Sequence, residues 1–126
     1  MAIEQMPGLD SLRQTIQTVL ELRALPAGWN SYRAPPIGCD AILTAIELLT
    51  RTIPPDAPLP HVVPTSLGGV QFDWRSPSLE VEVRVQPDRA ILLAYEDLRT
   101  GDEWEGEITQ HPERLVEILG SLAHHH

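Results

Sequence analysis

The chain has 126 residues, of which 42% are hydrophobic and 21% charged, and this favours one small globular domain. All nine basic residues are arginines, and eighteen Asp and Glu bring the formal net charge to -9. The arginines are scattered singly, so we expect no direct binding to nucleic acid. The sequence contains no run of about 18 apolar residues and no basic run followed by an apolar stretch, so it predicts neither a membrane span nor export.

The cysteine and histidine content bounds the compartment and the domain. The single cysteine, Cys39, cannot form an internal disulfide, which favours a reducing cytoplasm. We interpret residues 124–126, all histidine, as the remnant of a purification tag and leave them out of any metal argument. The remaining histidines are His61 and His111. We therefore expect a single domain over residues 1–123.

Two helices are predicted in the first half of the chain by apolar residues at three- and four-residue steps. The first is expected over residues 11–25, because Pro26 disfavours helical geometry in the residue before it. The second is expected over residues 39–52, where the apolar residues cover more than one face, as is typical of a buried helix. Proline-rich segments at residues 26–38 and 54–64 are interpreted as stiff connectors.

The apolar period then changes from 3.6 to 2, which predicts strands. In the clearest case Val81 and Val83 alternate with Glu80 and Glu82, so that one face is core and the other is wet. Proline, glycine and aspartate between the alternating segments predict short turns. Four strands are therefore expected, at about 70–75, 79–86, 90–95 and 103–108.

A short C-terminal helix is predicted after Pro112, which is well tolerated in a first helical turn. A run of helices followed by a run of strands favours the α+β class. The specific prediction is a two-layer domain with two N-terminal helices, a four-stranded antiparallel meander and a C-terminal helix. The helices should cover the apolar face of the sheet, toward which Phe72 and Trp74 point.

Two segments of the chain carry distinctive short motifs. The first is Gly-Trp-Asn-Ser-Tyr-Arg-Ala-Pro-Pro-Ile at residues 28–37. The second, at residues 62–74, combines Val-Val-Pro-Thr with a Gly-Gly strand that ends in Trp. Together they resemble motifs of a group of small prokaryotic proteins that has no established activity, and the resemblance covers roughly residues 25–85. It implies a small intracellular prokaryotic domain and brings no catalytic residues with it.

Most residues that could carry chemistry have an ordinary structural explanation. The Gly68-Gly69 pair precedes a predicted strand and not a helix, so we interpret it as a turn or bulge and not as a phosphate-binding loop. Cys39 or Ser66 together with a histidine could form a nucleophilic site, but no recognisable local signature accompanies either residue. We therefore name no catalytic residue, no metal ligand and no cofactor, and expect the protein not to be an enzyme.

Rows of carboxylates are the second chemical feature of the sequence. Glu80 and Glu82 lie about 7 Å apart on the same face of one strand. A solvated strand face explains such rows, whereas a metal-dependent hydrolase would need them adjacent with Asp73 or His61 nearby. The final predicted strand carries a similar row: Glu103, Glu105 and Glu107.

The preferred hypothesis is a non-enzymatic, acidic protein-interaction module. The last strand of the meander is expected at a sheet edge, where its charges either prevent aggregation or dock a basic protein. Aromatic side chains on the proline-rich loop would anchor that partner. An antitoxin-like or immunity-like inhibitor would fit this description. The candidate partner-binding residues are Trp29, Tyr32, Glu103, Glu105 and Glu107.

Two other hypotheses stay open at this point. The domain could be a structural unit that self-associates, as a homodimer, through its sheet edge or terminal helix. The less favoured alternative is the carboxylate metal-dependent hydrolase described above. All three hypotheses place the protein in the cytoplasm and away from nucleic acid and membranes.

Overall fold

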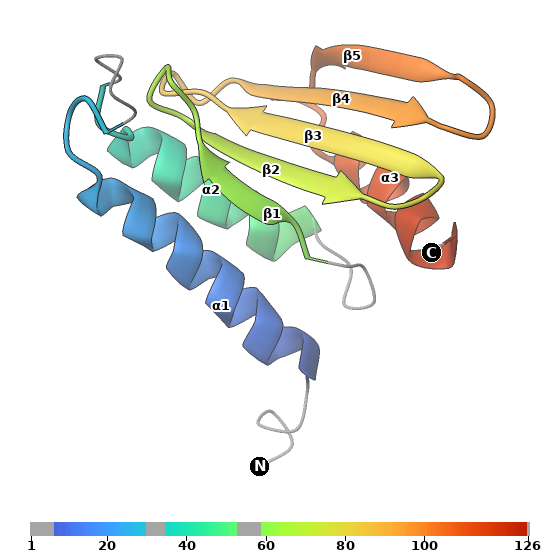
Figure 1. Cartoon of the computed structure of the whole chain (residues 1–126), viewed down its shortest axis with the longest axis horizontal. Helices are drawn as coiled ribbons and strands as arrows, with labels where there is room; N and C mark the ends of the chain where they lie inside the picture. The colour runs from blue at the N-terminus through green and yellow to red at the C-terminus, as the bar shows by residue number, and fades with distance from the viewer. Residues whose placement is uncertain (1–6, 30–34, 53–58, 126) are drawn as a thin grey trace.

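The computed structural model describes residues 7–29, 35–52 and 59–125, which form three α-helices, one 3-10 helix and a five-stranded sheet (Figure 1). The α+β class expected from the sequence is confirmed. In chain order the elements are α1 (Pro7–Glu21), η2 (Leu22–Ala24), α2 (Cys39–Thr52), β1 (His61–Pro64), β2 (Val70–Arg75), β3 (Leu79–Val85), β4 (Ile91–Asp97), β5 (Glu103–Glu107) and α3 (Glu113–His125).

The sheet is an antiparallel meander in the order β1-β2-β3-β4-β5, so every strand pairs with its neighbour in sequence. The three α-helices all lie on one side of this sheet, and no helix of the described residues covers the other side (Figure 1). This arrangement agrees with the expected two layers. We call the two sides the helix-covered face and the helix-free face.

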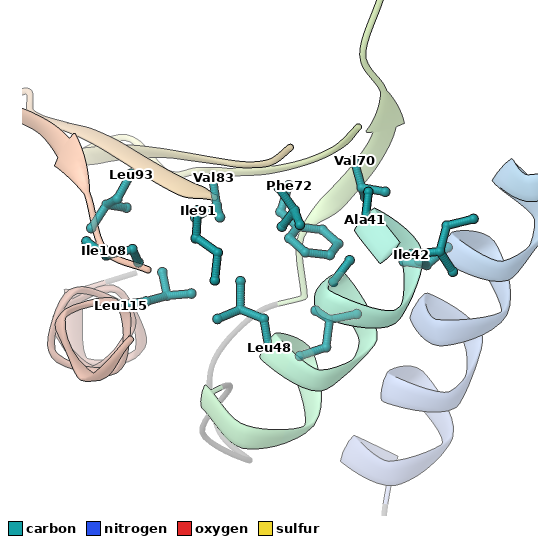
Figure 2. Packing of buried hydrophobic residues seen from close by; sticks show 14 of the residues in the cluster. Ala41, Ile42, Leu48, Val70, Phe72, Val83, Ile91, Leu93, Ile108 and Leu115 are labelled. Atoms are coloured by element: carbon teal, nitrogen blue, oxygen red, sulfur yellow. The ribbon is translucent and has the colours of Figure 1, made fainter. Parts of the chain in front are cut away.

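The core fills the space between the sheet and the helices, where apolar side chains of β2, β3 and β4 meet α2 and α3 (Figure 2). Because side chains alternate along a strand, every second residue of β2 and β3 is buried while the residues between them are not. The Phe72 and Trp74 rings lie 6.1 Å apart in this core. Both aromatics face the helices, as the sequence pattern indicated.

The first helix differs from its prediction at both ends. It begins earlier, at Pro7, a residue type that suits the first helical turn. The α-helical bonding stops at Glu21, and the last turn tightens into the 3-10 helix η2. Leu25 then adopts extended angles (φ -69°, ψ 127°), as expected for a residue before proline. The second helix, α2, has the predicted bounds, Cys39–Thr52.

The prediction of four strands is wrong, because β1 lies in what the sequence suggested was a proline-rich connector. β1 is only four residues long, ends at Pro64 and pairs with β2 alone. Proline is tolerated on an edge strand, where its missing N–H need not bond a neighbour, but it weakens the sequence pattern of a strand. Residues 53–58 of the connector lie outside the described residues.

The Gly68-Gly69 pair forms a turn, as predicted, and contacts the backbone at Gly38, which follows the first of the two motif segments. Gly68 has φ +89°, and its carbonyl accepts a 2.9 Å hydrogen bond from the Gly38 N–H. A Cβ on Gly69 would collide with the carbonyl oxygen of Val85. The close backbone approach explains why glycine is needed there. The pair therefore holds the start of α2 against the sheet.

Candidate functional site

The helix-free face of the sheet carries nine charged side chains among the described residues. Its side chains are those that alternate with the buried ones. They come together across the strands because the meander fixes which residues are opposite one another. A hollow of about 480 Å³ lies over one half of this face. It includes Ala94, whose small side chain lies between Glu82 of β3 and Glu105 of β5. The charged members of the face are Asp73, Arg75, Glu80, Glu82, Arg84, Glu96, Glu103, Glu105 and Glu107.

One row across this face contains three glutamates on three adjacent strands. Glu80 of β3 is the register partner of Glu96 on β4, which is in turn the partner of Glu103 on β5. Directly opposite side chains have Cβ atoms about 4.5–5.5 Å apart, and like charges at that spacing destabilise a sheet. Arg75 is the register partner of Glu80 on β2. Within the described residues, however, none of the three glutamates forms a salt bridge.

The neighbouring row of carboxylates is arranged differently, because each acid has a partner. The Gln71 Nε2 donates to Asp73 Oδ1 at 3.1 Å and to Glu82 Oε1 at 3.3 Å. The Arg84 Nε lies 3.4 Å from Glu82 Oε2, and its Nη2 lies 3.9 Å from Glu105 Oε1. These contacts offset the repulsion in their own row. The row Glu80–Glu96–Glu103, which has no salt bridge among the described residues, is thus the unusual part of the face.

The turn between β4 and β5 sets this row, because it decides which residues of the two strands lie opposite. Asp97 Oδ1 accepts the N–H of Arg99 at 2.9 Å and that of Thr100 at 3.3 Å. These backbone donors, the Arg99 N–H first among them, lower the pKa of the Asp97 carboxyl below its usual 3.8. Gly101 completes the turn with φ +79°. Glu96 and Glu103 face each other as a consequence.

The metal hypothesis finds only part of its required geometry. His61, Asp73 and Glu82 follow one another in register across β1, β2 and β3. The glutamates along β3 and the glutamates along β5 are, however, separated by β4. Within residues 7–29, 35–52 and 59–125, no group of three or more His, Cys, Asp or Glu side chains has an arrangement that could hold a metal ion.

The residues suggested as nucleophile and base are on separate elements. Cys39 is exposed at the first residue of α2, where the sequence placed it. His61 is on β1, and His111 precedes α3, where its Nδ1 lies 3.3 Å from Glu113 Oε1. In the described part of the chain, no hydrogen bond joins Cys39 or Ser66 to either histidine. The geometry therefore assembles no nucleophilic dyad from these groups.

The five proposed partner-binding residues do not form one cluster. Glu103, Glu105 and Glu107 are exposed and share the helix-free face. Trp29 lies in a turn closed by its N–H and the Pro26 carbonyl, is half-buried and does not line the hollow. Its indole nitrogen is buried and meets no acceptor among the described residues. Tyr32 lies outside the described residues.

Glu80 and Glu96 are the members of the face that the sequence did not bring together. The β3–β4 register is what makes them neighbours. The available signal was the alternation of side chains along a strand. Glu96 lies two residues after Ala94 and is therefore on the same face. Aligning β3 with β4 also requires the length of the turn between them, because the turn sets the register.

Neither a protein-family model nor a curated protein nor a solved structure matches this chain. The helices that the structure describes include none with both the length and the apolar character required to cross a membrane. Function is therefore inferred from the geometry of the helix-free face.

Proposed function

We propose that the protein is a non-catalytic interaction module of the prokaryotic cytoplasm, whose helix-free sheet face binds a basic protein. An inhibitor of the antitoxin or immunity type is the kind of protein that would work in this way. The observation that supports the proposal is the row Glu80–Glu96–Glu103, in which like charges are directly opposed.

Stability alone does not account for that row. Cross-strand like-charge pairs are destabilising, by a few tenths to about 1 kcal/mol each, whereas glutamine would keep the face polar without this penalty. Residues that reduce stability in the free protein are a recurrent feature of functional sites. A cationic partner would turn the same row into a set of favourable contacts, and the net charge of -9 would accelerate its approach.

A charge-reversal pair of variants tests the location of binding. The double variant Glu96→Lys/Glu103→Lys reverses two charges on the helix-free face, whereas Glu21→Lys/Glu47→Lys reverses two exposed charges on α1 and α2. Both have the same net charge. Each protein is used to capture partners from a lysate of the native host, with crosslinks mapped by mass spectrometry.

The expected result is a basic partner that crosslinks to the helix-free face, is lost with the first variant and is retained with the second. Equal loss with both variants would show that only net charge matters. An acidic or neutral partner, or turnover of a small molecule without any protein partner, would refute the proposal.

Kinetics separate long-range attraction from direct contact once the partner is known. Reversing the charges at Glu103, Glu105 and Glu107 should slow association, because these exposed groups attract the partner over a distance as well as contacting it in the complex. Trp29→Ala and Tyr32→Ala should mainly accelerate dissociation, since aromatic anchors act only in the bound complex. Surface plasmon resonance at several salt concentrations measures both rates. The reverse assignment of effects would show that Trp29 and Tyr32 are not anchors.

The self-association hypothesis has less support from the described surface. The large exposed hydrophobic side chains are dispersed over different elements, and stacking two helix-free faces would bring like charges together. Light scattering over a range of concentrations should therefore give the mass of a monomer, 14.0 kDa. A homodimer would instead favour the structural alternative. The exposed side chains concerned are Leu43, Leu67, Leu98 and Val116.

A further inference from the structure

The outer edge of β5 has a regular set of backbone groups that no described element covers. β5 is the last strand of the sheet, as Figure 1 shows at the top of the molecule. The Asp97 N–H donates to Asp102 O at 2.7 Å, and the Ile108 N–H donates to Ile91 O at 2.8 Å. In an antiparallel pair such bonds recur at every second residue. The even-numbered residues of β5 therefore bond β4, and the odd-numbered residues direct their N–H and C=O groups outward.

The residues with outward backbone groups are the three glutamates of the strand. Their side chains lie on the helix-free face, because alternate residues of a strand share a face. An added strand would therefore place a side chain directly opposite each of Glu103, Glu105 and Glu107. At every second residue, the edge thus has both outward backbone hydrogen-bonding groups and a negative charge.

The helix-covered side of this edge is already occupied by the protein itself. A Cβ on Gly106 would lie 2.9 Å from two atoms of the Trp104 ring, so the ring covers the strand at that glycine. The Tyr95 ring stacks with Trp104 at a centroid distance of 6.3 Å, and Arg114 of α3 lies 4.2 Å from the Trp104 centroid. With respect to the described residues, the backbone edge and the glutamate side of β5 remain open to a partner.

We propose that β5 is a strand-addition site that receives an extended, antiparallel segment with arginine or lysine at every second position. This proposal rests on the proposed function and names the way in which the basic partner binds. Main-chain hydrogen bonds would supply affinity, and the alternate basic side chains would supply specificity. The added segment becomes a sixth strand next to β5.

Charge complementarity identifies this occupant and excludes a second copy of the same strand. Antiparallel pairing of β5 with itself would place glutamates opposite glutamates, which disfavours the dimer. A basic segment converts each of these pairs into an opposite-charge pair. The edge therefore discriminates against its own copies and in favour of a cationic strand.

Two peptides of identical composition test the proposal on the full chain. Thr-Arg-Val-Arg-Thr-Arg-Val has arginine at every second position, and Val-Thr-Arg-Arg-Arg-Thr-Val has the same residues in a contiguous block. The alternating peptide should bind more tightly in calorimetry. Methylating the arginine amides should abolish binding because these amides bond β5, whereas methylating the other amides should be tolerated.

Backbone amide exchange, followed by NMR, provides a readout within the strand. At a peptide concentration of about ten times Kd, the amides of Glu103, Glu105 and Glu107 should exchange roughly tenfold more slowly. Trp104 and Gly106 already bond β4, so their amides serve as the internal control and should change little.

Two substitutions at one position separate the backbone contribution from the charge. Glu105→Gln should weaken binding of the alternating peptide by roughly two- to fivefold. Glu105→Pro loses the same charge and also the outward N–H, so affinity should fall by a further factor of about ten. Proline is tolerated where the N–H bonds no neighbouring strand, and thermal unfolding verifies that the variant folds.

Each alternative outcome has a distinct meaning. Equal binding of both peptides without slower exchange at the odd-numbered residues would overturn strand addition, while the helix-free face could still bind a basic protein. Failure of both peptides to bind would also overturn strand addition. The proposed function is tested separately by the lysate capture with the charge-reversal variants.

Discussion

The two faces of the sheet are made by the same strands and have opposite effects on stability. On the helix-covered face, Phe72, Val83 and Leu93 are completely buried and follow one another in register across β2, β3 and β4. On the helix-free face, Glu80 and Glu96 are opposed without a salt bridge in the described residues. A face that buries so much apolar surface lets the opposite face tolerate repulsion. The sheet is therefore a stable support for a charged surface.

The largest expected effect is on the helix-covered face. Phe72→Ala should lower the free energy of unfolding by about 3–5 kcal/mol, because it removes a buried ring and leaves a cavity. Arg75→Ala, at an exposed position of the same strand, should change it by less than about 0.5 kcal/mol. Urea denaturation measures both values. A similar cost for the two variants would remove the distinction between the faces.

A smaller effect of opposite sign is expected on the helix-free face. Glu96→Gln relieves repulsion from two register partners, so it should stabilise the free protein by about 0.2–1 kcal/mol. The matched control Glu47→Gln removes the 2.9 Å ion pair with Arg51 on α2 and should cost about 0.3–0.5 kcal/mol.

The salt dependence of the stability change provides a further test of this second comparison. The Debye length falls from about 10 Å at 0.1 M to about 3 Å at 1 M salt, so the gain from Glu96→Gln should shrink with added sodium chloride. Thermal unfolding of both variants at the two concentrations provides the measurement. Destabilisation by Glu96→Gln at low salt would contradict the interpretation that the row is repulsive.

The smallest expected effect concerns the turn that aligns the opposed glutamates. The pKa of Asp97 is lowered by the Arg99 N–H and other turn contacts, so the ionised carboxylate is favoured in the folded state. Its contribution to stability is present above the usual value of 3.8 and is lost as the pH falls through the lower, folded pKa.

Asp97→Asn should therefore remove this part of the acid dependence of unfolding. NMR titration of the carboxyl carbon measures the pKa directly, and urea denaturation between pH 2 and 5, a range of roughly one to two units around the usual value, measures its effect on stability. An Asp97 that titrates at or above 3.8 would show that the turn does not hold its carboxylate.

The sequence predicted much of the local structure because the relevant patterns lie within single elements. Helical spacing identified α2 with its observed bounds, and alternation identified β3 and the buried side of β2. The alternation also separated future core residues from outward carboxylates, since side chains on a strand change sides at every residue. For the candidate site, Glu103, Glu105 and Glu107 could be placed on one face in the same way.

What only the tertiary structure decided is which residues lie opposite one another. The strand β1 has too short and proline-rich a sequence to be recognised without its pairing to β2. The opposition of Glu80, Glu96 and Glu103 depends on register, which turns such as the one at Asp97 set between strands. The face on which a strand residue lies follows from the local alternation of side chains, so it can be predicted from the sequence. Register pairs residues that are distant along the chain and exists only in the assembled sheet.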